Sequence, residues 1–148
     1  MDHNIQSLLE IKGNQIYGVA EDTPVLEAVE KMCSLAVGAL LVMRADKPIG
    51  IFSERDLMTR VVLKKRDPES TRVGEVMTTD LIYTSAQQKI SEAMAMMTEK
   101  HFRHLPVMDD AKELKGMISI GDMVRAISAA QAQHINILED YITGKHMA

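Results

Sequence analysis

One short motif occurs twice in the chain, and its serine and aspartate are the residues best suited to binding chemistry. Gly50-Ile51-Phe52-Ser53-Glu54-Arg55-Asp56 recurs as Gly116-Met117-Ile118-Ser119-Ile120-Gly121-Asp122. In each copy a strand pattern ends at the serine and a helix pattern begins there. Backbone N–H groups at a helix N-terminus attract phosphate, and a nearby carboxylate accepts both hydroxyls of a ribose. The motif glycine would let a ligand lie close to the backbone.

A purely structural explanation of this motif stays open, because a serine followed three residues later by an acid is a variant of the capping box. The segment Lys100–Val107 favours the ligand interpretation. In this segment Arg103 is followed by His104 at the start of a predicted strand, where adjacent cations are costly unless an anion or an acid contacts them. The alternative is that both are surface residues paired with Glu99 or Asp109.

Other kinds of chemistry find little support. His101, Glu54 and Cys33 lack the combination of base, nucleophile and orienting group that catalysis requires, so we expect no enzyme and no catalytic residue. His101 and His104 have no further cysteine or histidine nearby, so we expect no metal site. Cys33 is the only cysteine, which excludes an intrachain disulfide, and it falls on the apolar pattern of a helix, so we expect a core residue.

Composition indicates an ordinary globular protein. Apolar residues make up 46% and charged residues 26% of the 148 residues, and no apolar run approaches the roughly 20 residues that span a bilayer. The first ten residues show no secretion signal, so we expect a cytoplasmic location. The net charge of −4 and the scarcity of aromatic residues disfavour nucleic acid and membrane as partners.

The motif belongs to a longer internal repeat. Val25–Met32 returns as Ile90–Met97 at an offset of 65, because Ala28 matches Ala93. The motif itself returns at an offset of 66, because Gly50 matches Gly116. One residue is therefore inserted between these segments, and the polar turn before the last strand is the natural place for it. That turn is 45–48 in the first copy and 109–113 in the second.

Each copy predicts the element order β-α-β-β-α. A short strand precedes an apolar helix, a hairpin follows, and a second helix opens at the motif serine. A sheet with helices on one face leaves its other face open, so we expect the two copies to pack sheet to sheet. The predicted apolar helix positions are Val25, Val29, Met32, Leu57, Val61 and Val62 in the first copy and Ile90, Met94, Met97, Met123, Val124 and Ile127 in the second. The predicted hairpin strands are 38–43 with 49–52 and 104–108 with 117–118.

These patterns predict three segments: repeat 1 over 1–70, repeat 2 over 71–128 and a helical tail over 129–148. Pro68–Arg72 is the expected polar link between the copies. The segment 8–13 leads into the first copy as 73–78 leads into the second. An apolar stripe at Gln131, His134, Ile135, Leu138 and Ile142 predicts that the tail helix packs on something.

From about Leu8 to Ser128 the chain resembles a tandem pair of cystathionine-β-synthase (CBS) domains. The two motifs carry this resemblance together with Val73-Gly74-Glu75-Val76-Met77-Thr78 and Arg103-His104-Leu105-Pro106-Val107. It implies an α+β fold in which two β-α-β-β-α units pack sheet to sheet as a pseudo-two-fold pair. It also implies two related clefts, each shared between the copies.

By this resemblance aspartate holds the ribose, serine and the cations hold the phosphate, and apolar residues hold the adenine. The family's ligands include AMP, ADP, ATP, NAD and S-adenosylmethionine, and the sequence does not choose among them. One implied cleft combines Ser119 and Asp122 with Lys12, Tyr17, Val37 and Gly38, and the other combines Ser53 and Asp56 with Ile82, Phe102, Arg103 and His104.

The copies differ at two places that bear on phosphate binding. Gly38-Ala39 stands where the second copy has Arg103-His104, and Arg55 stands where the second copy has Gly121. We therefore expect the cleft of Ser53, with Arg55, to be the stronger nucleotide site.

The resemblance predicts a non-catalytic regulatory module that binds an adenine nucleotide between its repeats and signals to an unidentified partner protein. It also implies a homodimer that uses the helix faces. The alternative is a structural or adaptor module without a small-molecule ligand, in which the motif serines and aspartates serve only as helix caps.

Overall fold

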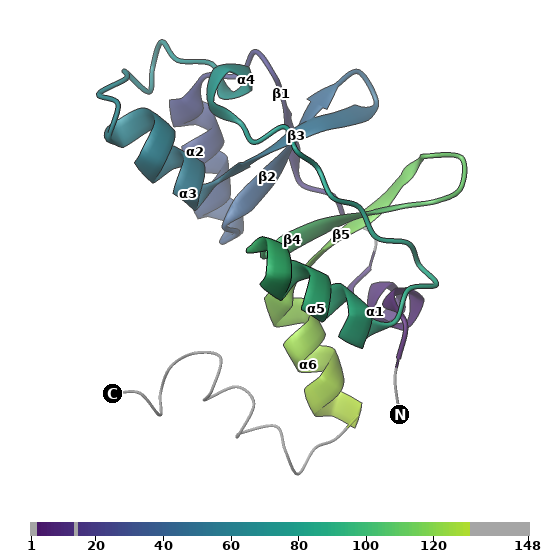
Figure 1. Cartoon of the computed structure of the whole chain (residues 1–148). Coiled ribbons are helices and arrows are strands. Elements are labelled where there is room, and N and C mark those ends of the chain that lie inside the picture. Colours follow the sequence, from purple (N-terminus) through teal and green to yellow (C-terminus); the bar gives the residue numbers. More distant parts are fainter. Residues whose placement is uncertain (1–2, 14, 131–148) are drawn as a thin grey trace, which may run out of the picture. The chain divides into compact units, whose positions relative to one another are not determined.

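The chain forms two compact units, and each holds one copy of the repeat. The computed structural model describes residues 3–13 and 15–130. The repeat-1 unit is Ile16–Ile82, and the repeat-2 unit combines Met1–Gln15 with Tyr83–Ala148. Helices and strands alternate in both units (Figure 1), so the predicted α+β fold class is confirmed. The predicted stripe from Gln131 to Ile142 lies outside the described residues.

The repeat-1 unit follows the predicted element order. Its sheet has the strand order β1-β2-β3, in which β1 runs parallel to β2 and β2 runs antiparallel to β3. The parallel pair requires a crossover, and α2 supplies it. The elements are β1 (Gly18–Ala20), α2 (Val25–Leu35), β2 (Ala39–Arg44), β3 (Lys47–Ser53), α3 (Glu54–Asp56) and the π-helical turn η1 (Leu57–Val62).

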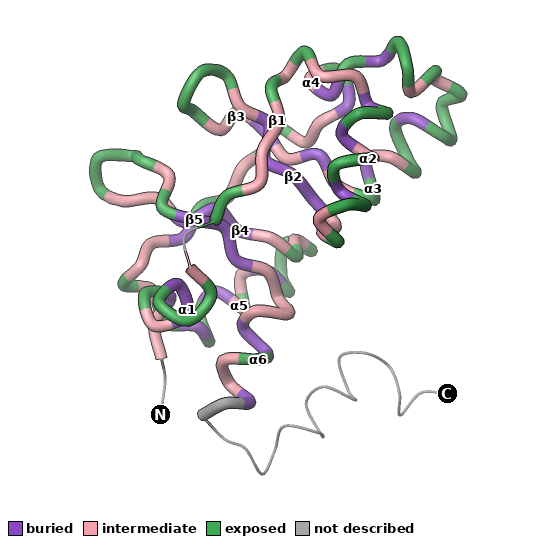
Figure 2. The backbone as a smooth tube through the Cα atoms, turned by 180° about the vertical axis from the view of Figure 1, so that it is seen from behind, coloured by how far each residue is buried: buried purple, intermediate pink, exposed green. Residues whose placement is uncertain are grey.

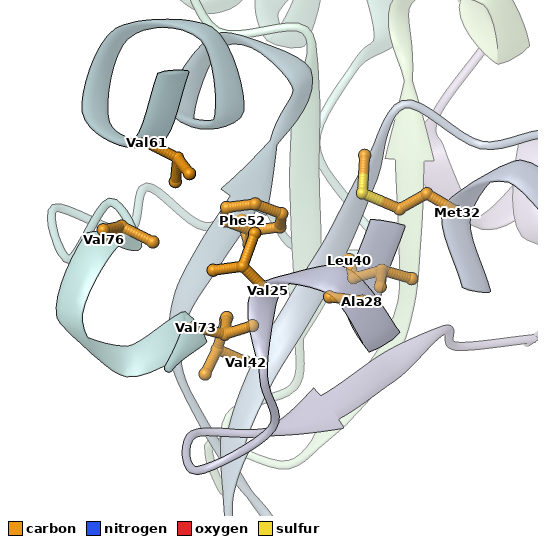
Figure 3. Packing of buried hydrophobic residues seen from close by; sticks show 9 residues of the cluster. All are labelled: Val25, Ala28, Met32, Leu40, Val42, Phe52, Val61, Val73 and Val76. Atoms are coloured by element: carbon orange, nitrogen blue, oxygen red, sulfur yellow. The ribbon is translucent and has the colours of Figure 1, made fainter. Parts of the chain in front are cut away.

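One hydrophobic cluster forms the centre of this unit (Figure 3). Helical periodicity brings three residues of α2 onto one face, and alternate residues of the strands meet that face. Phe52 is fully buried and is the largest side chain of the cluster. Its members are Val25, Ala28, Met32, Leu40, Val42, Phe52, Val61, Val73 and Val76.

Two predicted core positions of this unit are wrong. Cys33 is exposed because it lies one residue beyond Met32, which is buried, and consecutive helical residues point about 100° apart. Val62 is exposed to 63% while Val61 is buried. The π-turn explains that difference, because Leu63 N donates to Met58 O at 3.0 Å, five residues back, and the wider turn rotates the apolar face.

The repeat-2 unit has the same plan with a reduced first strand. Its elements are α5 (Ile90–Lys100), β4 (His104–Met108), β5 (Leu114–Ser119) and α6 (Ile120–Ala130), and β4 pairs antiparallel with β5. The predicted first strand is a single parallel bridge between Thr84 and Val107. That bridge repeats the pairing of Val19 with Val42 in the repeat-1 unit, with both partners shifted by 65 residues.

The two lead-in segments are helices. Helix α1 (Ile5–Lys12) belongs to the repeat-2 unit, and α4 (Val73–Val76) belongs to the repeat-1 unit. Ile5 N donates to Gln88 O at 2.9 Å, and Val73 N donates to Thr23 O at 2.8 Å. Helix α1, which directly precedes the first copy, therefore packs with the second copy. Helix α4, which directly precedes the second copy, packs with the first. Burial of apolar side chains on α1 and α4 is the physical reason. Figure 2 colours part of each helix as buried.

The expected polar link at Pro68–Arg72 is part of the repeat-1 unit. Val25 N donates to Thr71 O at 2.8 Å, and Leu26 N donates to Pro68 O at 2.9 Å. These bonds satisfy free N–H groups in the first turn of α2, which has no side-chain cap. The chain passes from one compact unit to the other at Gln15/Ile16 and at Ile82/Tyr83. The predicted segments follow the sequence repeat, and their boundaries therefore fall at other positions. The predicted sheet-to-sheet packing of the copies stays a prediction.

Candidate functional site

In the repeat-2 unit the motif forms a capping box at the N-terminus of α6. Asp122 N donates to Ser119 Oγ at 3.1 Å, and Ser119 N donates to Asp122 Oδ2 at 2.8 Å. The two bonds satisfy backbone N–H groups that the helix itself cannot use. The capping geometry expected from the spacing of Ser119 and Asp122 is therefore confirmed.

Two cations also contact the Asp122 carboxylate. Lys12 Nζ lies 2.6 Å from Oδ2, and Arg125 Nη2 lies 2.7 Å from Oδ1. Lys12 also donates to the carbonyl of Met117 at 2.5 Å. Burial raises the pKa of Asp122, but the hydrogen bonds from Lys12 and Ser119 outweigh it, so the pKa of this carboxyl lies below its usual value. The site thus holds an ionised carboxylate among positive charges.

The repeat-1 motif has the same cap and a different set of additional donors. Ser53 donates to Asp56 Oδ2 from its backbone N at 2.9 Å and from Oγ at 3.1 Å. Thr78 Oγ1 donates to Oδ1 at 2.9 Å, and Arg60 Nε lies 3.6 Å from that oxygen. Asp56 is only 4% exposed. A neutral hydroxyl therefore donates to Asp56 from the segment after α4, whereas an ammonium donates to Asp122 from the end of α1.

Arg103 and His104 lie beside the motif of their own unit. His104 pairs with Ser119 across β4 and β5, and Ile120 N donates to Arg103 O at 3.0 Å. Phe102 precedes them, two residues after the end of α5, and its N donates to Met97 O at 3.0 Å. The resemblance implied that these three residues share a cleft with Ser53, which belongs to the other unit, and that assignment stays a prediction.

Tyr17, Val37 and Gly38 belong to the repeat-1 unit, as do Arg55 and Ile82. Tyr17 O accepts a hydrogen bond from Leu41 N at 3.0 Å, so Tyr17 continues the β1·β2 pairing. Gly38 O accepts from Glu54 N at 3.1 Å, and a Cβ at Gly38 would overlap the Glu54 carboxylate. Gly38 therefore lies beside the repeat-1 motif. Its predicted role in the cleft of Ser119 and Asp122 stays a prediction.

The motif glycines are needed for chain packing. A Cβ at Gly50 would lie 2.9 Å from Thr78 O and 2.6 Å from Met77 Sδ. A Cβ at Gly116 would lie 2.9 Å from Leu9 Cδ2. The segment after α4 and helix α1 therefore occupy the side of each motif glycine on which a Cβ would lie. The predicted close approach of a ligand to these glycines stays a prediction.

Three contributors to the motif sites were not predicted. Arg60 and Arg125 follow the motif aspartates by four and three residues, which is the spacing of neighbours on a helix surface, and this spacing was readable from the sequence. Thr78 reaches Asp56 through tertiary contact alone, and no local pattern indicates it. Among the described residues, no group of three or more His, Cys, Asp or Glu could hold a metal ion. None of the described helices is long and apolar enough to cross a membrane.

Comparison with known proteins agrees with this geometry. Residues 10–63 and 73–129 each match the family model of the CBS domain. The CBS domain-containing protein CBSX3, mitochondrial, of Arabidopsis thaliana is 36% identical over 137 residues, which are 89% of this chain and 66% of that protein. Protein MK0525 of Methanopyrus kandleri is 31% identical over 111 residues, 72% of this chain and 57% of that protein. The chain thus spans less than two thirds of the length of these relatives.

Solved structures show the same fold. A CBS-domain protein from Burkholderia ambifaria MC40-6 is 40% identical with a TM-score of 0.82, and the match covers 86% of this chain and 96% of that chain. The CBS-domain protein ATU1752 from Agrobacterium tumefaciens is 32% identical with a TM-score of 0.77, covering 83% and 97% of the two chains. CBS-domain proteins are generally regulatory and often bind nucleotides. The mitochondrial location belongs to the Arabidopsis relative, and the cytoplasmic location of this chain stays a prediction.

Proposed function

This chain belongs to the CBS-domain family, and from that premise we propose that it is a non-catalytic regulatory module that binds an adenine nucleotide at its Ser-x-x-Asp turns. The ligand class comprises AMP, ADP, ATP and NAD, with S-adenosylmethionine as a further candidate. Binding would change the affinity of the module for a partner protein, which reads the occupancy of the site.

The arrangement around Asp122 is the observation that carries the proposal. The Asp122 side chain, which is 9% exposed, lies in the first turn of α6, and both Lys12 and Arg125 contact its carboxylate. His104, the first residue of β4, pairs with Ser119, and Arg103 directly precedes that strand. The chain as a whole carries a net charge of −4, so the pair of cations on Asp122, Lys12 and Arg125, is a local concentration of positive charge. The carboxylate can accept hydrogen bonds from ribose hydroxyls, and the cations and the helix N-terminus can bind phosphate. This combination matches the chemistry of a nucleotide.

The capping geometry supports a second candidate function, a structural or adaptor module. Asp56 is 4% exposed, and internal donors contact both of its carboxylate oxygens. In that case the motif residues stabilise the helix ends by about 1 kcal/mol each and bind no ligand.

A thermal-shift titration separates the two functions. The panel is AMP, ADP, ATP, NAD, NADH and S-adenosylmethionine, with Asp56→Asn and Asp122→Asn as matched site variants. A saturable rise in melting temperature that one variant abolishes supports the nucleotide module and identifies the motif used. If no compound shifts the natural-sequence chain, the adaptor function replaces it.

We propose that the active form is a homodimer assembled through helix faces. A group of exposed apolar side chains lies on one part of the repeat-1 unit, and Leu63 among them is exposed to 73%. They lie on or next to α2 and η1, and they are Leu26, Met58, Val62 and Leu63. Light scattering should give a mass of twice 16.5 kDa. A monomer mass that does not change with concentration would exclude this assembly.

A further inference from the structure

The two oxygens of the Asp122 carboxylate are not equally occupied. Oδ2 accepts from Ser119 N at 2.8 Å and from Lys12 Nζ at 2.6 Å. Oδ1 accepts from Arg125 Nη2 at 2.7 Å. A carboxylate oxygen offers two lone pairs, so these bonds fill Oδ2 and leave one acceptor position on Oδ1.

A ribose needs an acceptor position on each oxygen when its two hydroxyls bind one carboxylate side by side. Oδ1 has that position, and Oδ2 does not. The Ser119 N–H belongs to the backbone cap of α6 and is fixed by it. Lys12 is the side-chain donor on Oδ2, so its ammonium must leave that oxygen before both hydroxyls can bind.

We propose that Lys12 is an internal counter-ion that makes the Asp122 site selective for phosphorylated nucleotides over nucleosides. This inference rests on the proposed function. The phosphate of a nucleotide offers the displaced ammonium a new anion within the reach of a flexible lysine chain. A nucleoside offers none, so a partly buried ammonium, 31% exposed, loses its charged partner without replacement.

The repeat-1 motif has no lysine on its aspartate; its cation is Arg60, whose Nε lies 3.6 Å from Asp56 Oδ1. Both hydrogen bonds on Asp56 Oδ2 come from Ser53, and the donor from the distant segment is the neutral Thr78 hydroxyl on Oδ1. The Ser53 hydroxyl can rotate away from Oδ2 without separating two charges. Selection for phosphate through a displaced lysine is therefore a property of the Asp122 site.

Calorimetric titration with AMP and adenosine tests the proposal on the natural-sequence chain and on a parent chain that carries Asp56→Asn, in which the repeat-1 motif does not contribute. The variants below are made in that parent. Lys12→Met removes the ammonium and keeps the length of the side chain. Lys12→Arg keeps the positive charge and provides a second variant. Lys115→Met is the matched control, because Lys115 is a lysine of the same unit whose ion pairs with Asp109 and Glu113 lie on the β4–β5 hairpin.

We expect opposite changes for the two ligands. In Lys12→Met the affinity for adenosine rises about threefold to tenfold because Oδ2 becomes free, and the affinity for AMP falls, so the AMP-to-adenosine ratio shrinks by about tenfold or more. Lys12→Arg and Lys115→Met keep the ratio within about threefold of the parent.

Two results would overturn the inference while leaving the proposed function intact. One is an unchanged ratio in Lys12→Met. The other is binding of AMP only when Asp56 is present, which would place the ligand at the repeat-1 motif. If the natural-sequence chain binds no adenine compound at all, the proposed function itself fails.

Discussion

Lys12 Nζ lies 2.6 Å from Asp122 Oδ2, although the two residues are 110 positions apart in the sequence. Lys12 is the last residue of α1, and Asp122 lies in the first turn of α6. The contact exists because α1 packs in the repeat-2 unit, where Ile5, Leu8 and Leu9 are buried. The same packing places a charged partner on one motif aspartate and leaves the other with a threonine.

The ion pair should make stability depend on pH in the acid range. The pKa of Asp122 is lowered from its usual 3.8, so the folded chain holds the carboxylate ionised more strongly than the unfolded chain does. This contribution is present above the unfolded pKa and is lost as the pH falls through the folded one. We expect Lys12→Met to reduce the free energy of unfolding by about 1 kcal/mol at neutral pH. Urea titrations should show that the difference shrinks below about pH 4. A difference independent of pH would contradict the ion pair.

Three glycine-to-alanine changes should differ in their effect on stability according to the atoms that the added Cβ contacts. Gly50→Ala should destabilise by about 2 to 3 kcal/mol because the backbone carbonyl of Thr78 is in the way. Gly116→Ala should cost about 1 kcal/mol, since the obstacle is the flexible end of Leu9. Gly121→Ala should stabilise α6 by about 0.5 to 1 kcal/mol, because its Cβ meets only ordinary contacts. Thermal unfolding of the three variants gives this order, and equal losses at all three would refute it.

The Thr78 hydroxyl should contribute more to the free energy of unfolding than the partial exposure of this residue suggests. Thr78→Val keeps the shape of the side chain and removes the hydrogen bond to Asp56 Oδ1, which leaves a buried carboxylate short of a donor. We expect a loss of about 1 to 2 kcal/mol in the free energy of unfolding. Thr79→Val, at an exposed neighbour, should change it by less than about 0.5 kcal/mol. Similar effects of both changes would argue against the Asp56 contact.

The thiol of Cys33 should react in the folded protein. It is exposed on α2, so a disulfide reagent such as DTNB should modify one thiol per chain without denaturant. Cys33→Ser should abolish the signal and leave the free energy of unfolding within about 0.5 kcal/mol. A thiol that reacts only in urea would show that Cys33 is buried in the folded protein.

Local patterns predicted most of the secondary structure. The apolar spacing of Val25–Met32 and Ile90–Met97 corresponds to α2 and α5, because residues three and four apart share a helix face. The predicted strand 104–108 is β4 itself. The second copy's first strand failed to form beyond one bridge at Thr84, and the π-turn at η1 altered which residues are buried. Both depend on pairing and packing that a window of sequence does not contain.

The site could be predicted only as far as its local part. Ser53 with Asp56, and Ser119 with Asp122, form capping boxes because each aspartate follows its serine by three positions, which is the spacing that the start of a helix requires. Local spacing could not show which atoms occupy the space next to Gly50 and Gly116. A missing side chain creates room, but which neighbour enters that room is settled by distant segments.

The sequence by itself determined the twofold repeat, its family, the β-α-β-β-α order and the capped motif, because these follow from spacing over a few residues and from similarity between two copies. The tertiary structure alone decided that α1 packs with the second copy and α4 with the first. It thereby decided that Asp122 meets the ammonium of Lys12 and that Asp56 meets the hydroxyl of Thr78. The physical reason is that burial of an apolar helix face selects among surfaces far away in the chain, and polar side chains at the ends of those helices are carried to partners that no local pattern specifies.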